Sequence, residues 1–162
     1  MSSRATQKVA MLMGGLSAER EVSLVSGREC AAALRGEGFE VIELDAGADL
    51  AQRLEDLRPD VAFNALHGRW GEDGAVQGLL EWLKIPYTHS GVLASALGMD
   101  KQRSKKTFVE AGLHVVDRKI LAKSDAARQL LLPAPYVIKP NNEGSSVGIY
   151  FVQDGANVLP DL

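Results

Sequence analysis

The stretch Val9-Ala10-Met11-Leu12-Met13-Gly14-Gly15 is a continuous apolar run that stops at two glycines. A run of this kind is typical of a strand in a parallel sheet that is covered on both faces. Apolar stretches at 39–44 and 61–66 predict two more strands, and helical patterns lie between the three, the second of them at 49–57. The order β-α-β-α-β predicts an α/β fold with a parallel sheet and right-handed crossovers.

The first predicted helix begins near Ser17, which is a suitable N-cap residue, and ends near Gly36. Glu19 falls in its first turn, where a carboxylate interacts favourably with the helix dipole. One face of this helix contains, at helical spacing, Val22, Val25, Glu29 or Cys30, and Ala33.

A second domain is predicted to begin where the character of the sequence changes, between residues 91 and 100. Asp100 is a plausible N-cap for a basic helix over 101–111. We therefore divide the chain into domains at 1–97 and 98–162. The remaining predicted elements are helices at 75–84, 92–97 and 125–131 and strands at 85–88, 115–121, 135–139 and 148–152.

Composition and charge exclude several classes of protein. The 162 residues carry 18 Lys and Arg against 21 Asp and Glu, for a net charge of −3, which argues against a nucleic-acid partner. No uninterrupted apolar stretch is long enough to span a membrane, and Cys30 is the single cysteine, so no disulfide can form within the chain. We expect a cytoplasmic protein.

Two glycine-containing loops are predicted to meet at one edge of the sheet, where parallel α/β proteins bind ligands. One begins at Gly14, and the other is His67–Gly74. Taken alone, Glu19 is either a ligand for an ammonium group or a partner of the helix dipole. His67 is either a donor to a carboxylate or a hydrogen-bonding residue of the loop.

A phosphate site is the corresponding hypothesis for the second domain. Lys139 closes a predicted strand and is followed by a loop of small, hydroxyl-bearing and glycine residues that ends at Gly148. Backbone N–H groups, hydroxyls and a lysine suit phosphate, although a hairpin loop with a surface lysine fits the same residues. Lys101 lies near a predicted helix N-terminus, where the helix dipole disfavours a cation, so it either has a nearby anion such as phosphate or belongs to a solvated basic helix.

Five stretches together resemble, in order and spacing, the signature motifs of the D-alanine:D-alanine ligases of the ATP-grasp superfamily. They are Gly14–Gly27, Ala65–Gly74, Tyr87–Gly91, Met99–Lys101 and Lys139–Gly148. The resemblance implies a Rossmann-like, D-alanine-binding amino-terminal domain over 1–97. It also implies the first part of an ATP-grasp module over 98–162.

The resemblance further implies ATP-dependent joining of two D-alanines through an acyl phosphate, which supplies a peptidoglycan precursor. Glu19 would bind the ammonium of the first D-alanine and form a relay with Ser145, and His67 would hold the substrate carboxylate. The family also implies a homodimer through the amino-terminal domain and a need for Mg²⁺. The residues implied to bind or cover ATP are Lys101, Lys139, Gly144, Ser146 and Val147.

The sequence departs from such ligases in length, because it stops at Leu162. The ligands that the family uses for Mg²⁺ would lie beyond that residue, so we assign no metal ligand and expect these 162 residues alone not to ligate. Two alternatives stay open. One is an ATP-grasp ligase for another carboxylate and amine, which would have no need of Glu19, His67 and Ser145 together. The other is a non-catalytic binding or dimerisation module.

Overall fold

The computed structural model describes residues 6–126, 132–144 and 147–153. The chain divides into two compact units, Met1–Gly98 and Met99–Leu162, and each is described by itself.

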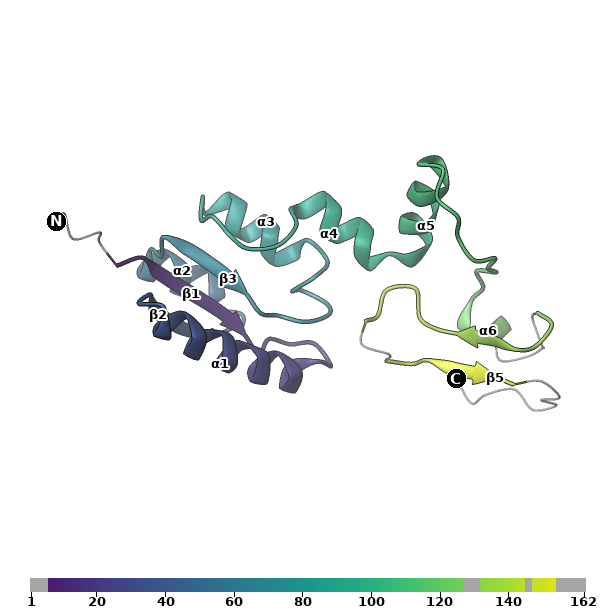
Figure 1. Cartoon of the computed structure of the whole chain (residues 1–162), viewed down its shortest axis with the longest axis horizontal. Helices are drawn as coiled ribbons and strands as arrows, with labels where there is room; N and C mark the ends of the chain where they lie inside the picture. The colour runs from purple at the N-terminus through teal and green to yellow at the C-terminus, as the bar shows by residue number, and fades with distance from the viewer. Residues whose placement is uncertain (1–5, 127–131, 145–146, 154–162) are drawn as a thin grey trace. The chain divides into compact units, whose positions relative to one another are not determined.

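The first unit is built on a parallel sheet of three strands (Figure 1). The strands are β1 (Lys8–Met13), β2 (Glu40–Asp45) and β3 (Val61–Asn64), in the order β2-β1-β3. In the register, Val9 of β1 is opposite Val41 of β2 and Val61 of β3. The predicted parallel β-α-β-α-β arrangement is confirmed. The apolar run of the sequence is the central strand, which explains why it is apolar on both faces.

Helices cover both faces of this sheet. They are α1 (Arg20–Gly36) on one face and α2 (Leu50–Leu57) and α3 (Ala75–Trp82) on the other, whereas α4 (Val92–Met99) follows them along the chain and buries none of its residues. Leu12 of β1 belongs to a buried cluster with Leu54 of α2 and Leu80 of α3, whereas Met11 belongs to a second cluster with Ala31 of α1. Side chains alternate along a strand, so one central strand supplies both cores. Full burial contributes roughly 2 kcal/mol for each leucine.

Helix α1 differs from its prediction in its start and in its buried face. Its first residue is Arg20 and Glu19 is its N-cap, without a side-chain capping bond. The buried residues of α1 are Ser23, Gly27 and Ala31, and not the face that contains Val22, Val25 and Ala33. The reason is the close approach of α1 to β1. A Cβ at Gly27 would lie 2.5 Å from the Cβ of Met13, so only small residues fit on this face.

The strand predicted at 85–88 is reduced to a single bridge. Tyr87 pairs with Ala62 of β3 in the parallel sense. The Ala62 N–H donates to the Pro86 carbonyl at 2.8 Å and the Thr88 N–H to the Ala62 carbonyl at 3.1 Å. This segment therefore extends the sheet beside β3 without forming a full strand.

The second unit contains α5 (Lys101–Glu110), α6 (Lys123–Ala126), β4 (Tyr136–Ile138) and β5 (Tyr150–Val152). Asp100 caps α5 as predicted, because its side chain accepts the Arg103 N–H at 3.0 Å. Strands β4 and β5 pair antiparallel.

Two further elements were predicted for the second unit, a strand at 115–121 and a helix at 125–131. The strand predicted at 115–121 is wrong, since the segment has no regular structure and exposes Val116 and Ile120. Of the helix predicted at 125–131, residues 127–131 lie outside the described residues. Nowhere in the described parts of either unit does a helix have the length and apolar character needed to cross a membrane.

Candidate functional site

The two glycine loops of the first unit meet at the carboxyl edge of the sheet. The first follows β1 at Gly14, and the second follows β3 and contains His67. Ser17 joins them, because its Oγ donates to the His67 carbonyl at 2.8 Å and accepts the Glu19 N–H at 3.1 Å. Both loops therefore lie where the sequence predicts a ligand site.

An ion pair between Arg20 and Asp45 holds the first loop in place. The guanidinium makes a bidentate contact with the carboxylate, at 2.7 Å and 2.5 Å, and Arg20 also donates to the Gly15 carbonyl at 3.1 Å. The Asp45 carboxylate accepts the Gly15 N–H at 3.2 Å. Gly14 has a φ of +72°, and a Cβ there would lie 2.3 Å from the Asp45 Oδ1, so both conformation and space require glycine.

The same ion pair determines the charge state of Asp45. The hydrogen bond from Arg20 lowers the pKa of Asp45 from 3.8 to about 2, against a smaller opposing effect of burial. The carboxylate is therefore ionised at neutral pH, and the pair remains available to fix the turn that leads into α1.

Glu19 is the acidic residue of this site. It is 6% exposed, and its Oε1 is buried without a hydrogen-bond partner. The carboxylate lies against Gly68, where a Cβ would come within 2.8 Å of Oε1 and where φ is +68°. A buried acceptor without a partner is costly unless a donor satisfies it. Glu19 therefore suits a ligand that brings an N–H group or a positive charge.

Two buried amides hold the second loop. Asn64 Nδ2 and Gln77 Nε2 both donate to the Gly71 carbonyl, at 2.9 Å and 2.8 Å. Asn64 Oδ1 also accepts the Leu66 N–H at 3.1 Å. A loop whose backbone is bonded to the end of β3 and to α3 keeps His67 in a defined position relative to the sheet.

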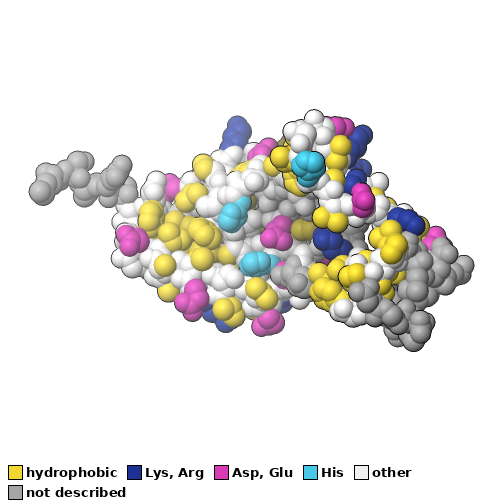
Figure 2. Space-filling view, turned by 45° about the vertical axis from the view of Figure 1, so that its right-hand side comes forward, with side chains coloured by type: hydrophobic (Ala, Val, Ile, Leu, Met, Phe, Trp, Pro, Cys, Tyr) yellow, Lys and Arg dark blue, Asp and Glu magenta, His cyan; other side chains and the backbone are white. Residues whose placement is uncertain are grey.

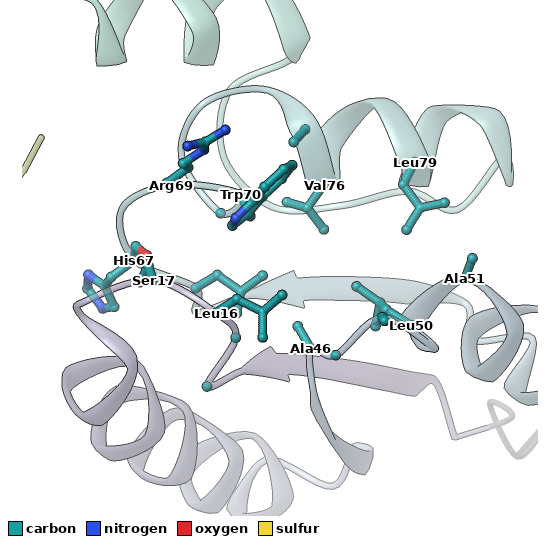
Figure 3. A pocket seen from close by; sticks show the side chains of 17 residues that line it. Leu16, Ser17, Ala46, Leu50, Ala51, His67, Arg69, Trp70, Val76 and Leu79 are labelled. Atoms are coloured by element: carbon teal, nitrogen blue, oxygen red, sulfur yellow. Dashed lines mark hydrogen bonds between the residues drawn. The ribbon is translucent and has the colours of Figure 1, made fainter. Parts of the chain in front are cut away.

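A cavity of about 360 Å³ lies between the two loops, α2 and α3 (Figure 3). Its walls are mostly apolar, and Figure 3 shows Leu16, Val76 and Leu79 turned toward it. The Arg69 guanidinium stacks on the Trp70 ring at the rim, 4.7 Å from the ring centre. Of the two candidate residues, His67 is among the residues that line the cavity and Glu19 is not.

The second unit places two lysines at a smaller cavity of about 120 Å³. Lys101 and Lys139 line it together with Gly144 and Val147. Lys101 Nζ donates to the carbonyls of Asn141, at 3.3 Å, and Glu143. Burial, followed by repulsion from Lys139, lowers the pKa of Lys101. Two cations at one cavity favour an anionic ligand.

The predicted site residues thus fall into two groups. Glu19 and His67 lie in loops of the first unit that contact one another through Ser17. Lys101, Lys139, Gly144 and Val147 line one cavity of the second unit, whereas Ser145 and Ser146 lie outside the described residues. Sequence reasoning missed the partners of these residues, chiefly Arg20, Asp45, Asn64 and Gln77. An aspartate that ends a strand at a predicted ligand edge was the available signal for Asp45.

Comparison with known proteins identifies relatives along the whole chain. A sequence model of the family described as D-ala D-ala ligase N-terminus matches residues 43–90. A D-alanine–D-alanine ligase of Dinoroseobacter shibae is 67% identical over 162 residues, which are all of this chain and 53% of the relative. One from Ruegeria sp. is 70% identical over 155 residues, 96% of this chain and 51% of the relative.

Solved structures agree with the sequence matches. The crystal structure of D-alanine–D-alanine ligase from Bacillus anthracis is similar with a TM-score of 0.74 and 38% identity, over 92% of this chain and 50% of that one. The complex of the Bacillus anthracis ligase with ATP is similar with a TM-score of 0.68 and 34% identity, over 93% of this chain and 51% of that one. The chain therefore spans about half the length of the relatives that it matches.

Proposed function

This chain is a homologue of the amino-terminal half of the D-alanine–D-alanine ligases, and from that premise we propose that it forms one half of an ATP-dependent ligase. Residues 1–97 supply the site for the first D-alanine, and residues 98–162 supply the first part of the ATP site. The observation that carries the proposal is the buried Glu19 side chain, whose Oε1 has no hydrogen-bond partner, between two loops whose sequences match this family.

The proposed reaction has two steps. The carboxylate of the first D-alanine attacks the γ-phosphorus of ATP, and ADP leaves with formation of an acyl phosphate. The amine of the second D-alanine then attacks the acyl carbon, loses a proton and displaces inorganic phosphate. The product is the dipeptide used for peptidoglycan. We place this reaction in the cytoplasm, where ATP is available.

Glu19 binds the ammonium of the first D-alanine in this proposal. Its carboxylate is almost completely removed from water, so an ammonium that pairs with it is attracted more strongly than at an exposed carboxylate. His67 holds the carboxylate of the same D-alanine from the neighbouring loop, and Ser145 joins Glu19 in a hydrogen-bonded relay.

Lys101 and Lys139 neutralise the phosphates of ATP, while Gly144, Ser146 and Val147 cover them. Burial and then repulsion from Lys139 lower the pKa of Lys101, and a bound phosphate would offset both effects by favouring the charged ammonium. Phosphoryl transfer depends mainly on positioning and charge neutralisation, and both lysines line one cavity. We assign no residue of this chain to Mg²⁺, whose ligands belong to the carboxyl-terminal half of such ligases.

The decisive experiment joins this chain to the carboxyl-terminal half of the Dinoroseobacter shibae relative and measures phosphate release with ATP and D-alanine. The intact relative serves as the positive control. We expect D-alanine-dependent turnover from the fusion and none from the 162-residue chain alone. A folded fusion without turnover would overturn the proposed function, and turnover by the chain alone would overturn the expectation that it needs a second half.

Two substitutions in this fusion test the assignment of roles. Glu19→Gln should raise the KM for D-alanine at least tenfold with little change in the KM for ATP, because it removes the charge that faces the ammonium. The exposed Glu21→Gln is its matched control and should change neither. If Glu19→Gln raised both KM values equally, the assignment would be wrong.

Lys139→Ala should show the reverse pattern, with the KM for ATP raised at least tenfold. Lys106→Ala is the control, since Lys106 is an exposed lysine on α5 that contacts Glu110 at 3.9 Å. An unchanged KM for ATP in Lys139→Ala would mean that Lys139 is a surface lysine.

We further propose that the first unit forms a homodimer. It exposes several large apolar side chains, among them Trp82 (85% exposed) and Leu93 (73%), and Figure 2 shows a group of hydrophobic side chains on its visible face. Sedimentation equilibrium of the chain should show a monomer–dimer equilibrium that Trp82→Lys weakens. A strict monomer at high concentration would refute this part of the proposal.

A further inference from the structure

Three serines from α1 and the loop before it hold the segment that follows β3. Ser17 Oγ donates to the His67 carbonyl at 2.8 Å, and Ser23 Oγ donates to the Ala65 carbonyl at 2.7 Å. Ser26 Oγ lies 3.3 Å from Nε2 of the His67 ring. The two glycine-containing motifs are thus joined by side-chain bonds, and the third bond involves the imidazole itself.

The proton of the Ser26 hydroxyl has a defined acceptor. Ser26 Oγ lies 2.9 Å from the carbonyl of Val22, one turn earlier in α1. A carbonyl oxygen only accepts, so the single hydroxyl proton of Ser26 is used in that bond, as is common for helical serines. Toward the His67 ring, Ser26 Oγ then acts as an acceptor, and the ring nitrogen that faces it must carry a hydrogen.

We infer that Ser26 is a positioning residue that fixes neutral His67 in the tautomer with its proton on Nε2. The nitrogen left for a ligand is Nδ1, which in the neutral ring is an acceptor only. A carboxylate can then bind at Nδ1 only if the ring takes up a second proton there. Figure 3 shows the ring directed away from the apolar Leu16, Val76 and Leu79 side chains. The inference concerns the ligand-free chain and goes beyond the proposed function.

The test is a ¹⁵N NMR measurement of the imidazole nitrogens in the 162-residue chain, at a pH at which the rings are neutral. The chain contains three histidines, and the other two are internal references. His89 Nε2 lies 2.6 Å from the Asn64 carbonyl and must carry a hydrogen there, while His114 is exposed and is expected to show nitrogen shifts averaged over both tautomers. Figure 2 shows histidine side chains at the molecular surface.

We expect His67 to resemble His89, with two widely separated nitrogen shifts and the proton on Nε2. Ser26→Ala should bring the two shifts of His67 closer together, toward the averaged values of His114, without changing His89. Ser26→Thr keeps a hydroxyl that can bond the same carbonyl, and it should restore the wild-type pattern. Ser95→Ala removes another helical serine, whose Oγ donates to the Ser90 carbonyl, and should leave His67 unchanged.

Two results would overturn the inference. One is a wild-type His67 with its proton on Nδ1, which requires no variant. The other is an unchanged His67 spectrum in Ser26→Ala when the His89 signals report a native fold. Neither result bears on phosphate release by the fusion, so failure of this inference and failure of the proposed function are distinguishable.

Discussion

Replacing Asp45 by asparagine removes one partner of the ion pair that fixes the Gly14–Gly15 turn while keeping the size of the side chain. The pKa of Asp45 falls from 3.8 to about 2, chiefly because of the hydrogen bond from Arg20. A fall of this size corresponds to at most ~2.4 kcal/mol. The side chains of Arg20 and Asp45 are 42% and 46% exposed, so solvent screening reduces the expected loss to about 1 kcal/mol.

The pH dependence of this loss has a definite sign. A carboxyl whose pKa is lower in the folded state stabilises the fold above its unfolded pKa, and the stabilisation disappears as the pH falls through the folded pKa. The difference between wild type and Asp45→Asn should therefore be full at pH 7, decrease to about half at pH 3, and vanish below the folded pKa of about 2.

Urea unfolding followed by tryptophan fluorescence measures this difference. Trp70 and Trp82 are the two tryptophans, and both lie in the unit that contains the pair. Glu43→Gln is the matched control, because it breaks a single-bonded pair between β2 and Arg35 of α1 and should cost under about 0.5 kcal/mol. The reasoning would be refuted if Asp45→Asn lowered the free energy of unfolding by no more than Glu43→Gln does. It would also be refuted if the loss caused by Asp45→Asn did not change between pH 7 and pH 3.

Glycine substitutions give the remaining predictions, measured by the same fluorescence assay. Gly27→Ala should cost about 2 kcal/mol because its Cβ would lie 2.5 Å from β1, whereas Gly36→Ala, with no atom within 4 Å, should be neutral or slightly stabilising. Equal changes in stability for Gly27→Ala and Gly36→Ala would disprove the close approach of α1 to β1. Gly38→Ala should lower the free energy of unfolding by roughly 1–2 kcal/mol, because Gly38 has a positive φ but no neighbouring atom within 4 Å. Gly68→Ala should lower it by more, because Gly68 also has a positive φ and the Glu19 carboxylate must move as well. An equal loss of stability in Gly68→Ala and Gly38→Ala would mean that the Glu19 side chain can move away from Gly68 without a cost in free energy.

Much of the fold could be predicted because burial shows in the sequence as periodicity. The central strand is buried on both faces and is apolar at every position, so β1 was recognisable. The inner face of α1 was not, because Ser23, Gly27 and Ala31 are selected by space and hydrogen bonding instead of by hydrophobicity. The segment 115–121 carries strand-forming residues, but strand formation also needs a neighbour, which a local pattern does not reveal.

The candidate site shows the same division. The position of the two glycine loops followed from the rule that ligands bind at the carboxyl edge of a parallel sheet. The residues themselves singled out Glu19 and His67, and the resemblance to a family chose between the two interpretations of each. The contacts that place them join residues far apart in sequence, such as Ser17 with His67 and Arg20 with Asp45, and no spacing rule points to these pairs.

The sequence by itself determined the β-α-β-α-β order of the first unit, its parallel sheet and the family, because periodicity and motif spacing are local properties of the chain. Only the tertiary structure decided that Glu19 has a buried oxygen without a partner and that Ser26 meets the His67 ring. Burial and hydrogen-bond partners depend on which distant segments pack together, and a linear pattern does not contain that information.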